Sequence, residues 1–216
     1  MFINTTTHTD PIIYHDNSSK SSPWWPRIVA TRLSVTLPND LMVITWTNRE
    51  NTFLEDQLPI TVLRRQGRWR HYNKFLLLDE ALPSKYLLCV DSDDVVITDL
   101  TTIVERFNSY QCDVLFGAER VNYPLSETAR QNRLRTRVEG PYCYLNAGVF
   151  MGRAPQMANF LRISRAVFWW DTLIASGDDQ GAIVRLYEKM WPSVKIDHRC
   201  LIFQNLHTAD NDICEF

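Results

Sequence analysis

Residues 86–94 read YLLCVDSDD, five apolar residues followed at once by three carboxylates and one serine. A short apolar run bounded by polar residues is typical of a strand that is buried on both faces. Carboxylates crowded into one turn repel one another, and a divalent cation offsets that repulsion when it binds among them. The stretch therefore predicts a buried strand over 86–90 that ends at a cation site formed by Asp91, Asp93 and Asp94.

The flanking sequence predicts further strands that alternate with helices. Short apolar runs indicate strands at 41–46 (LMVITW), 113–116 (DVLF) and 148–151 (GVFM), and helical patterns occur at 69–80, 100–107, 156–170 and 180–189. This alternation is typical of an α/β fold with a mainly parallel, twisted sheet and helices on both faces. Ligands of such sheets bind beyond the carboxyl ends of the strands, where the acidic residues are expected to lie.

Length and composition indicate one domain. A single core serves chains of up to about 250 residues, and this chain has 216 residues, of which 45% are hydrophobic. We expect the domain to span 27–216. Residues 1–26, which are rich in Ser, Thr, Asn and Pro, are expected to form an N-terminal arm pinned by Trp24 and Trp25.

Charge and cysteine content limit the partners and the compartment. A formal net charge of -2, without basic residues interleaved with aromatic ones, gives no reason to expect nucleic acid as a partner. No segment approaches the apolar length of a membrane-spanning helix, which is about 20 residues. The five cysteines include no CxxC pair, which favours reduced, mostly buried thiols. We therefore expect a soluble, cytoplasmic protein, or a domain cut from a longer one.

The acidic stretch is compatible with a phosphatase. Asp91, Asp93 and Val95 match the opening DxDx[TV] motif of the haloacid-dehalogenase class, and the acids at 178–179 resemble its later acidic pair. Those enzymes use a lysine between the two motifs to hold the phosphoryl charge, whereas no lysine occurs over 86–188. The phosphatase interpretation is therefore the weaker alternative.

Four later segments follow the acidic stretch in a distinctive order. They are 117–124 (GAERVNYP), 144–152 (YLNAGVFMG), 178–180 (DDQ) and 197–206 (DHRCLIFQNL). Together with DSDD after a buried strand, the series resembles the glycosyltransferase domain of the procollagen lysyl hydroxylases, where the motifs read DSxD, SAE, YLNSGGFIG, DDQ and DHRCRIFQNL. The resemblance covers residues 41–216, and residues 1–40 have no counterpart in it.

The resemblance implies a GT-A fold, which is Rossmann-like, and a metal-dependent glycosyltransferase. A hexose-type sugar is then expected to pass from a UDP-sugar donor to a hydroxyl group of a glycan or protein acceptor, with Mn²⁺ or Mg²⁺ as cofactor. Asp91 and Asp94 match the metal-binding acids of the family, and Asp93 supplies the alternative DxD spacing. A catalytically silent carbohydrate-binding domain with the same fold is the alternative from another functional class.

The resemblance also places the remaining site residues. Around the nucleotide it places Thr45, Thr47, Ser92 and Lys74. Around the donor sugar and the acceptor it places Tyr123, Asn146, Asp178 and Asp179. One of the two aspartates is expected to orient the acceptor hydroxyl or to act as its base. Both aspartates also suit the start of a helix, where acids are favoured, and a lone lysine on a helix is commonly solvated.

One part of the family pattern has no match in this sequence. The third metal ligand of the family is a histidine in a glycine-rich segment, beyond the point where this chain stops. Three alternatives follow: the ligand is missing, it comes from a truncated part of the protein, or His207 replaces it. The second alternative implies a C-terminal truncation, and fusion to further domains is compatible with it.

Overall fold

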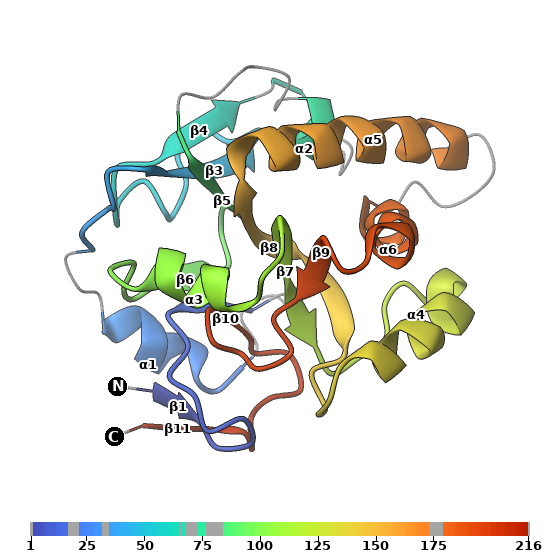
Figure 1. The fold of residues 1–216 in the computed structure, drawn as a ribbon. Helices are drawn as coiled ribbons and strands as arrows, with labels where there is room; N and C mark the ends of the chain where they lie inside the picture. The colour runs from blue at the N-terminus through green and yellow to red at the C-terminus, as the bar shows by residue number, and fades with distance from the viewer. Residues whose placement is uncertain are drawn as a thin grey trace.

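A six-stranded sheet lies at the centre of the fold (Figure 1). The computed structural model describes residues 2–16, 22–31, 35–64, 66–67, 73–76, 84–172 and 179–215. Across the sheet the strands are β4 (Thr61–Arg64), β3 (Leu41–Thr47), β5 (Tyr86–Val90), β8 (Tyr144–Arg153), β7 (Val114–Glu119) and β9 (Val194–Ile196). β3 is parallel to β4 and β5, and β7 is parallel to β9, whereas β8 is antiparallel to both of its neighbours. The sheet is therefore mainly parallel, which confirms the predicted α/β class.

Helices cover both faces of this sheet, as the sequence predicts. The helices of the described residues are α1 (Trp25–Ala30), α2 (Asn73–Leu76), α3 (Ile103–Ser109), α4 (Thr128–Leu134), α5 (Ala154–Thr172) and α6 (Asp179–Met190), with short 3-10 turns η1 (Leu125–Glu127) and η2 (Arg135–Arg137). Successive side chains of a strand point to opposite faces. Leu87 and Cys89 of β5 accordingly enter the core that includes α5 and α6, whereas Leu88 and Val90 enter the core that includes α3.

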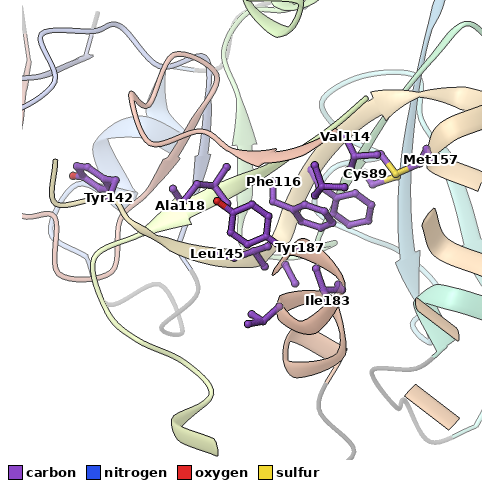
Figure 2. Close-up of a cluster of buried hydrophobic side chains, with 14 of the residues drawn as sticks. Cys89, Val114, Phe116, Ala118, Tyr142, Leu145, Met157, Ile183 and Tyr187 are labelled. Atoms are coloured by element: carbon purple, nitrogen blue, oxygen red, sulfur yellow. The ribbon is translucent and has the colours of Figure 1, made fainter. Parts of the chain in front are cut away.

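The core between the sheet and α5 and α6 is drawn in Figure 2. In it, Cys89 and Phe116 from the sheet lie with Met157 of α5 and Ile183 of α6, and each of these side chains is at most 1% exposed. The rings of Phe116 and Phe150 stack with their centroids 4.9 Å apart. This packing fixes the ends of β5 and α6, which carry residues of the candidate site.

Most predicted elements occur with shifted bounds. The strand predicted at 86–90 is β5, and the strand predicted at 148–151 is the second half of the longer strand β8. Of the helix predicted over 69–80, the structure describes only α2, because residues on both sides of it lie outside the described ranges. Within the described residues, no helix combines the length with the apolar content that a bilayer crossing requires.

Two smaller sheets join the N-terminal residues to later parts of the chain. β2 (Ile13–His15) lies between β10 (Phe203–Asn205), to which it is parallel, and β6 (Val95–Ile97), to which it is antiparallel. β1 (Phe2–Asn4) pairs with β11 (Ile213–Glu215), so the two ends of the chain lie side by side (Figure 1). The sequence predicts no strand in this region, because each strand has only three residues.

Asp197 links the end of β9 to the start of β10. Its buried carboxylate accepts hydrogen bonds from the backbone N–H groups of residues 201–203, at 2.7 to 2.9 Å, and from the hydroxyl of Tyr110. Asp197→Ala would leave these donors without an acceptor, and one buried unsatisfied group costs about 1–3 kcal/mol. We expect the free energy of unfolding, measured in urea, to fall by about 3 kcal/mol. The control is Asp113→Ala at a half-exposed carboxylate, and equal losses in the two variants would contradict the prediction.

Candidate functional site

The loop between β5 and β6 carries the predicted acidic residues. Asp91 directly follows β5, and its backbone N–H donates to the carbonyl oxygen of Gly148 on the neighbouring strand β8, at 2.8 Å. Asp94 ends the loop, and its carbonyl oxygen accepts a hydrogen bond from the N–H of Asp16 at 2.9 Å. The side chains of Asp91 and Asp94 are 31% and 27% exposed. The loop is thus fixed at both ends, with its carboxylates at the carboxyl end of β5.

The structure adds His15 to these acids. His15 ends β2 and is 2% exposed, and its Nε2 atom lies 3.7 Å from Asp91 Oδ2 and 3.6 Å from Asp94 Oδ2. Within the described part of the chain, this buried nitrogen has no hydrogen-bond partner. One ligand atom from each of the three residues lies within 4.8 Å of the other two. Carboxylate oxygens suit Mg²⁺ and Mn²⁺, so these residues fit a divalent ion of that kind.

A glycine makes room for the histidine ring. A Cβ atom at Gly148 would lie 2.2 Å from Cε1 of His15, 2.6 Å from its Nε2 and 2.9 Å from Asp91 Oδ2. The imidazole ring therefore packs directly on the backbone of β8. Any side chain at position 148 would displace the ring from the two acids, which explains the glycine of the YLNAG segment.

A buried lysine faces the same carboxylates. Lys74 of α2 is 7% exposed, and its Nζ atom lies 2.7 Å from Asp91 Oδ1 and 3.5 Å from Asp179 Oδ2. Burial alone would lower the pKa of Lys74, but the charges of Asp91 and Asp179 raise it above its ordinary value. The two oxygens of Asp91 thus face different partners: Oδ1 faces the ammonium group of Lys74, and Oδ2 faces the imidazole of His15. Lys74 is not the solvated surface residue that the sequence leaves open as an alternative.

Opposing effects set the protonation of the histidine and the acids. Burial would lower the pKa of His15, but the neighbouring carboxylates of Asp94 and Asp91 raise it to about 9. Burial raises the pKa of Asp91 despite the nearby cations, whereas His15 lowers the pKa of Asp94 against the effect of burial. A proton on Nε2 and a divalent ion would compete for the same position between the carboxylates.

Asp93 is not part of this group. Its Oδ2 atom lies 3.0 Å from Nη1 of Arg49, on the loop after β3, and accepts a hydrogen bond from the hydroxyl of Ser92 at 3.0 Å. Of the three acids expected to bind metal, the structure brings Asp91 and Asp94 together with His15. Asp93 pairs with Arg49 instead.

The two threonines expected at the nucleoside are buried in β3. Thr45 is 0% exposed and donates its hydroxyl to the carbonyl oxygen of Val90 at 2.8 Å. Thr47 is 3% exposed, and its hydroxyl oxygen accepts a hydrogen bond from the N–H of Arg49 at 3.0 Å. Both hydroxyls therefore bond within the fold, while their strand ends at the same edge of the sheet as Asp91.

Tyr123 and Asn146 are connected by hydrogen bonds to two further polar residues, Glu119 and Gln180. Gln180 donates from Nε2 to Glu119 Oε1 at 3.0 Å and to the carbonyl oxygen of Tyr123 at 2.9 Å, and its Oε1 accepts from the N–H of Ala147 at 3.0 Å. Asn146 donates from Nδ2 to Glu119 Oε2 at 3.4 Å. The Tyr123 side chain itself is 54% exposed. Glu119 and Gln180 lie in the GAERVNYP and DDQ segments but were not expected as site residues, and they hold a loop, a strand and a helix together.

The acidic pair at 178–179 is described in part. Asp179 is the first residue of α6, is 5% exposed, and faces Lys74. It therefore lies at a helix start, as the sequence allows, and it also faces the charged group around Asp91, while its expected role at the donor sugar and acceptor stays a prediction. Asp178 lies outside the described residues.

The sequence does not predict His15 as a ligand. One signal was available, because residues 12–16 (IIYHD) repeat the order of the acidic stretch, an apolar run followed at once by polar side chains. His207, the replacement considered from the sequence, does not belong to the group, because it lies in a turn after β10.

Comparison with known proteins places the chain in a family. The family model described as the PLOD GT domain matches residues 72–215. The chain is 32% identical over 152 residues to the procollagen-lysine,2-oxoglutarate 5-dioxygenase of Drosophila melanogaster, covering 65% of this chain and 20% of that protein. It is 31% identical over 134 residues to the multifunctional procollagen lysine hydroxylase and glycosyltransferase of Caenorhabditis elegans, covering 59% and 17%.

These matches cover only part of each relative. A further one, the human procollagen-lysine,2-oxoglutarate 5-dioxygenase 1, is 28% identical over 139 residues, covering 59% of this chain and 17% of that protein. The chain thus spans a fifth or less of the length of these relatives. The family match includes Lys74, Asp91, Asp94 and Asp179, whereas His15 precedes it. Since the family model covers well over half of the chain and the α/β fold agrees with it, the chain belongs to the PLOD GT domain family, the glycosyltransferase domain of the procollagen lysyl hydroxylases.

Proposed function

We propose that this glycosyltransferase moves a hexose-type sugar from a UDP-sugar to a hydroxyl group of a glycan or protein, with Mn²⁺ or Mg²⁺ held by His15, Asp91 and Asp94. The observation that supports the metal most directly is the Nε2 atom of His15, which is buried between two carboxylates and has no hydrogen-bond partner in the described part of the chain. Buried polar atoms are nearly always paired. A cation coordinated by Nε2 and the two acids would satisfy all three side chains.

Two positive charges would serve the diphosphate. When bound, a divalent ion would supply Lewis-acid stabilisation of the leaving nucleoside diphosphate. Lys74 is the protein's own cation beside Asp91, and its ammonium group is suited to a phosphate oxygen. The sequence has neither GxGxxG nor GxxxxGK[ST], the two common glycine loops that bind phosphate through backbone N–H groups. The proposal therefore assigns the diphosphate to the metal and to the side-chain charge of Lys74.

The residues beyond the acidic loop would serve the sugar and the acceptor. Asp179 lies 3.5 Å from Lys74, close enough to the metal group to orient an acceptor hydroxyl or accept its proton. Asn146 and Tyr123 are joined to Gln180 by hydrogen bonds, Asn146 through Glu119 and Tyr123 through its own carbonyl oxygen, while the Tyr123 side chain is exposed. The five thiols are free and four of them are buried. Because disulfides are rare in the cytosol, free thiols support a cytoplasmic location as part of this proposal.

Release of UDP tests this function. The wild-type chain is incubated with Mn²⁺ and a panel of UDP-hexoses, including UDP-glucose and UDP-galactose, with simple glycosides and peptides as acceptors. We expect at least one donor to release UDP, and we expect excess EDTA to reduce the release to background. Equal release with and without EDTA would contradict the metal. Absence of release, although UDP and Mn²⁺ together raise the melting temperature, would favour the catalytically silent alternative.

A further inference from the structure

Among the described residues, the side chain of Asn205 is the hydrogen-bond partner of Nδ1, the second ring nitrogen of His15. Its Oδ1 atom lies 2.7 Å from Nδ1 of His15. Asn205 is 0% exposed and His15 is 2% exposed, so no solvent competes for this hydrogen bond. The two residues are direct partners in the parallel pairing of β2 and β10, and the N–H of Leu206 also donates to the carbonyl oxygen of His15 at 2.9 Å.

The orientation of the Asn205 amide is fixed by a third residue. Its other terminal atom lies 2.7 Å from the carbonyl oxygen of Ala118. A carbonyl oxygen can only accept a hydrogen bond, so the atom that faces it must be the NH₂ group of the asparagine. The opposite orientation would place two oxygen atoms 2.7 Å apart without a proton between them. The atom that faces Nδ1 of His15 is therefore the amide oxygen.

This orientation determines which ring nitrogen of a neutral His15 carries the proton. The amide oxygen of Asn205 only accepts, so Nδ1 must donate and must hold the proton. Nε2 then has a free lone pair, and this is the atom that lies 3.7 and 3.6 Å from the carboxylates of Asp91 and Asp94. The hydrogen bonds from Asn205 to Ala118 and from His15 to Asn205 thus leave Nε2 of His15 available as a ligand.

A second glycine, Gly117, leaves room for the Asn205 side chain. A Cβ atom at Gly117 would lie 3.1 Å from Nδ2 of Asn205 and 2.7 Å from Cγ2 of Val149. Gly117 lies at the shift in register between β7 and β8, next to Ala118. Gly117 of β7 therefore lies against the Asn205 amide, and Gly148 of β8 lies against the His15 ring. Neither side chain can tilt toward the strand of its glycine without contacting that backbone.

We propose that Asn205 is a positioning residue for metal binding, which fixes the tautomer and the direction of His15 so that Nε2 coordinates the ion. The proposal rests on the function proposed above, because it requires that a divalent ion binds beside Asp91 and Asp94. Hydrogen bonds to the second nitrogen of a ligating histidine typically change metal affinity by about 10- to 100-fold. Asn205 acts through His15 and makes no contact with substrate in this role.

The first test reads the tautomer in the wild-type chain, and a variant serves only to assign the resonance. In protein labelled with ¹⁵N at histidine and loaded with diamagnetic Mg²⁺, the ring nitrogen shifts report the tautomer, and His15→Gln assigns the resonance among the five histidines. We expect a protonated Nδ1 and an unprotonated, metal-shifted Nε2. A proton on Nε2 with a free Nδ1 in the loaded protein would overturn the proposal.

The second test separates positioning from stability through Mn²⁺ affinity, measured by titration calorimetry. Asn205→Ala is expected to weaken Mn²⁺ binding by about 10- to 100-fold. Asn205→Asp keeps an acceptor for Nδ1 but places a carboxylate against the Ala118 carbonyl. It is therefore expected to keep Mn²⁺ affinity within about fivefold of wild type while its melting temperature falls. The control is Asn4→Ala, which removes an equally buried asparagine with hydrogen bonds to Tyr142 and Gln204 and no contact with His15.

The outcomes distinguish this proposal from the proposed function. Wild-type affinity in Asn205→Ala, or an equal loss in Asn205→Asp and Asn205→Ala, would overturn the role of Asn205 while leaving the metal site in place. An equal loss in Asn4→Ala would show a general effect of destabilisation and would overturn it as well. Failure of the wild-type chain to bind Mn²⁺ at all would instead defeat the proposed metal-dependent function.

Discussion

Asp94→Asn is expected to lower the rate of sugar transfer at a fixed, subsaturating Mn²⁺ concentration by about a hundred- to a thousandfold, equivalent to about 3–4 kcal/mol. Asp94 offers one of two carboxylates beside His15, at 3.6 Å from its Nε2. An asparagine keeps the size of the side chain but removes the negative charge that would hold a divalent ion. The measurement is UDP release as a function of Mn²⁺ concentration, and part of the loss should return at high Mn²⁺.

Asp93→Asn is the matched control on the same loop. Asp93 is next to Asp94 in sequence, but its carboxylate pairs with Arg49 at 3.0 Å, and both side chains are partly exposed. Pairs of this kind contribute about 0–1 kcal/mol, so we expect a loss of less than about tenfold. A loss in Asp93→Asn as large as that in Asp94→Asn would show that the alternative DxD spacing holds the metal, and the site around His15 would be wrong.

Lys74→Met is expected to reduce the free energy of unfolding by about 3–5 kcal/mol, the usual effect of removing one partner from a buried ion pair. Lys74 is 7% exposed, and its ammonium group lies between Asp91 and Asp179. Methionine fills the same volume but leaves the buried carboxylate of Asp179 and the partly exposed carboxylate of Asp91 without this ammonium group. Urea denaturation of the metal-free protein measures the loss.

Divalent metal should reverse part of this loss. A bound ion would supply the positive charge that Lys74→Met removes, so Mn²⁺ is expected to raise the melting temperature of the variant more than that of the wild-type chain. Lys85→Met is the control, because Lys85 is exposed and its amine lies 5.3 Å from the ring centre of Tyr86. We expect that control to change stability by less than about 1 kcal/mol. Equal stability of the two variants would contradict the charge balance described for Asp91.

The parts of the fold with long apolar runs could be predicted from the sequence. β5 has the predicted bounds because all five of its residues are buried and a charged residue ends the run. β8 was predicted only over its second half, since polar Asn146 interrupts the apolar pattern of Tyr144–Arg153. The antiparallel direction of β8 is a property of chain connectivity, and local residue pattern carries no signal for it.

The site could be predicted only where its residues belong to motifs. Asp91 and Asp94 follow a strand that is evident from composition, and Asp179 and Asn146 belong to segments that resemble a family. His15 belongs to neither class, because β2 has three residues and its partners are 80 to 190 positions away. A strand of three residues forms because it pairs with the two strands beside it, not because of its own residue pattern. The place of His15 in the site is therefore evident only from the pairing of β2 with β6 and β10.

The position of β2 has a consequence for the order of folding. While the chain is being synthesised, β2 can pair with β6 only after residue 97 has emerged, and with β10 only after residue 205. Contacts over such sequence separations form slowly, because a long loop must close before the pairing contributes any stability. One edge of β2 therefore stays unpaired until β10 has been synthesised, after all six strands of the central sheet. Binding of metal by His15 would accordingly report that the long-range pairing of β2 with β6 and β10 is complete.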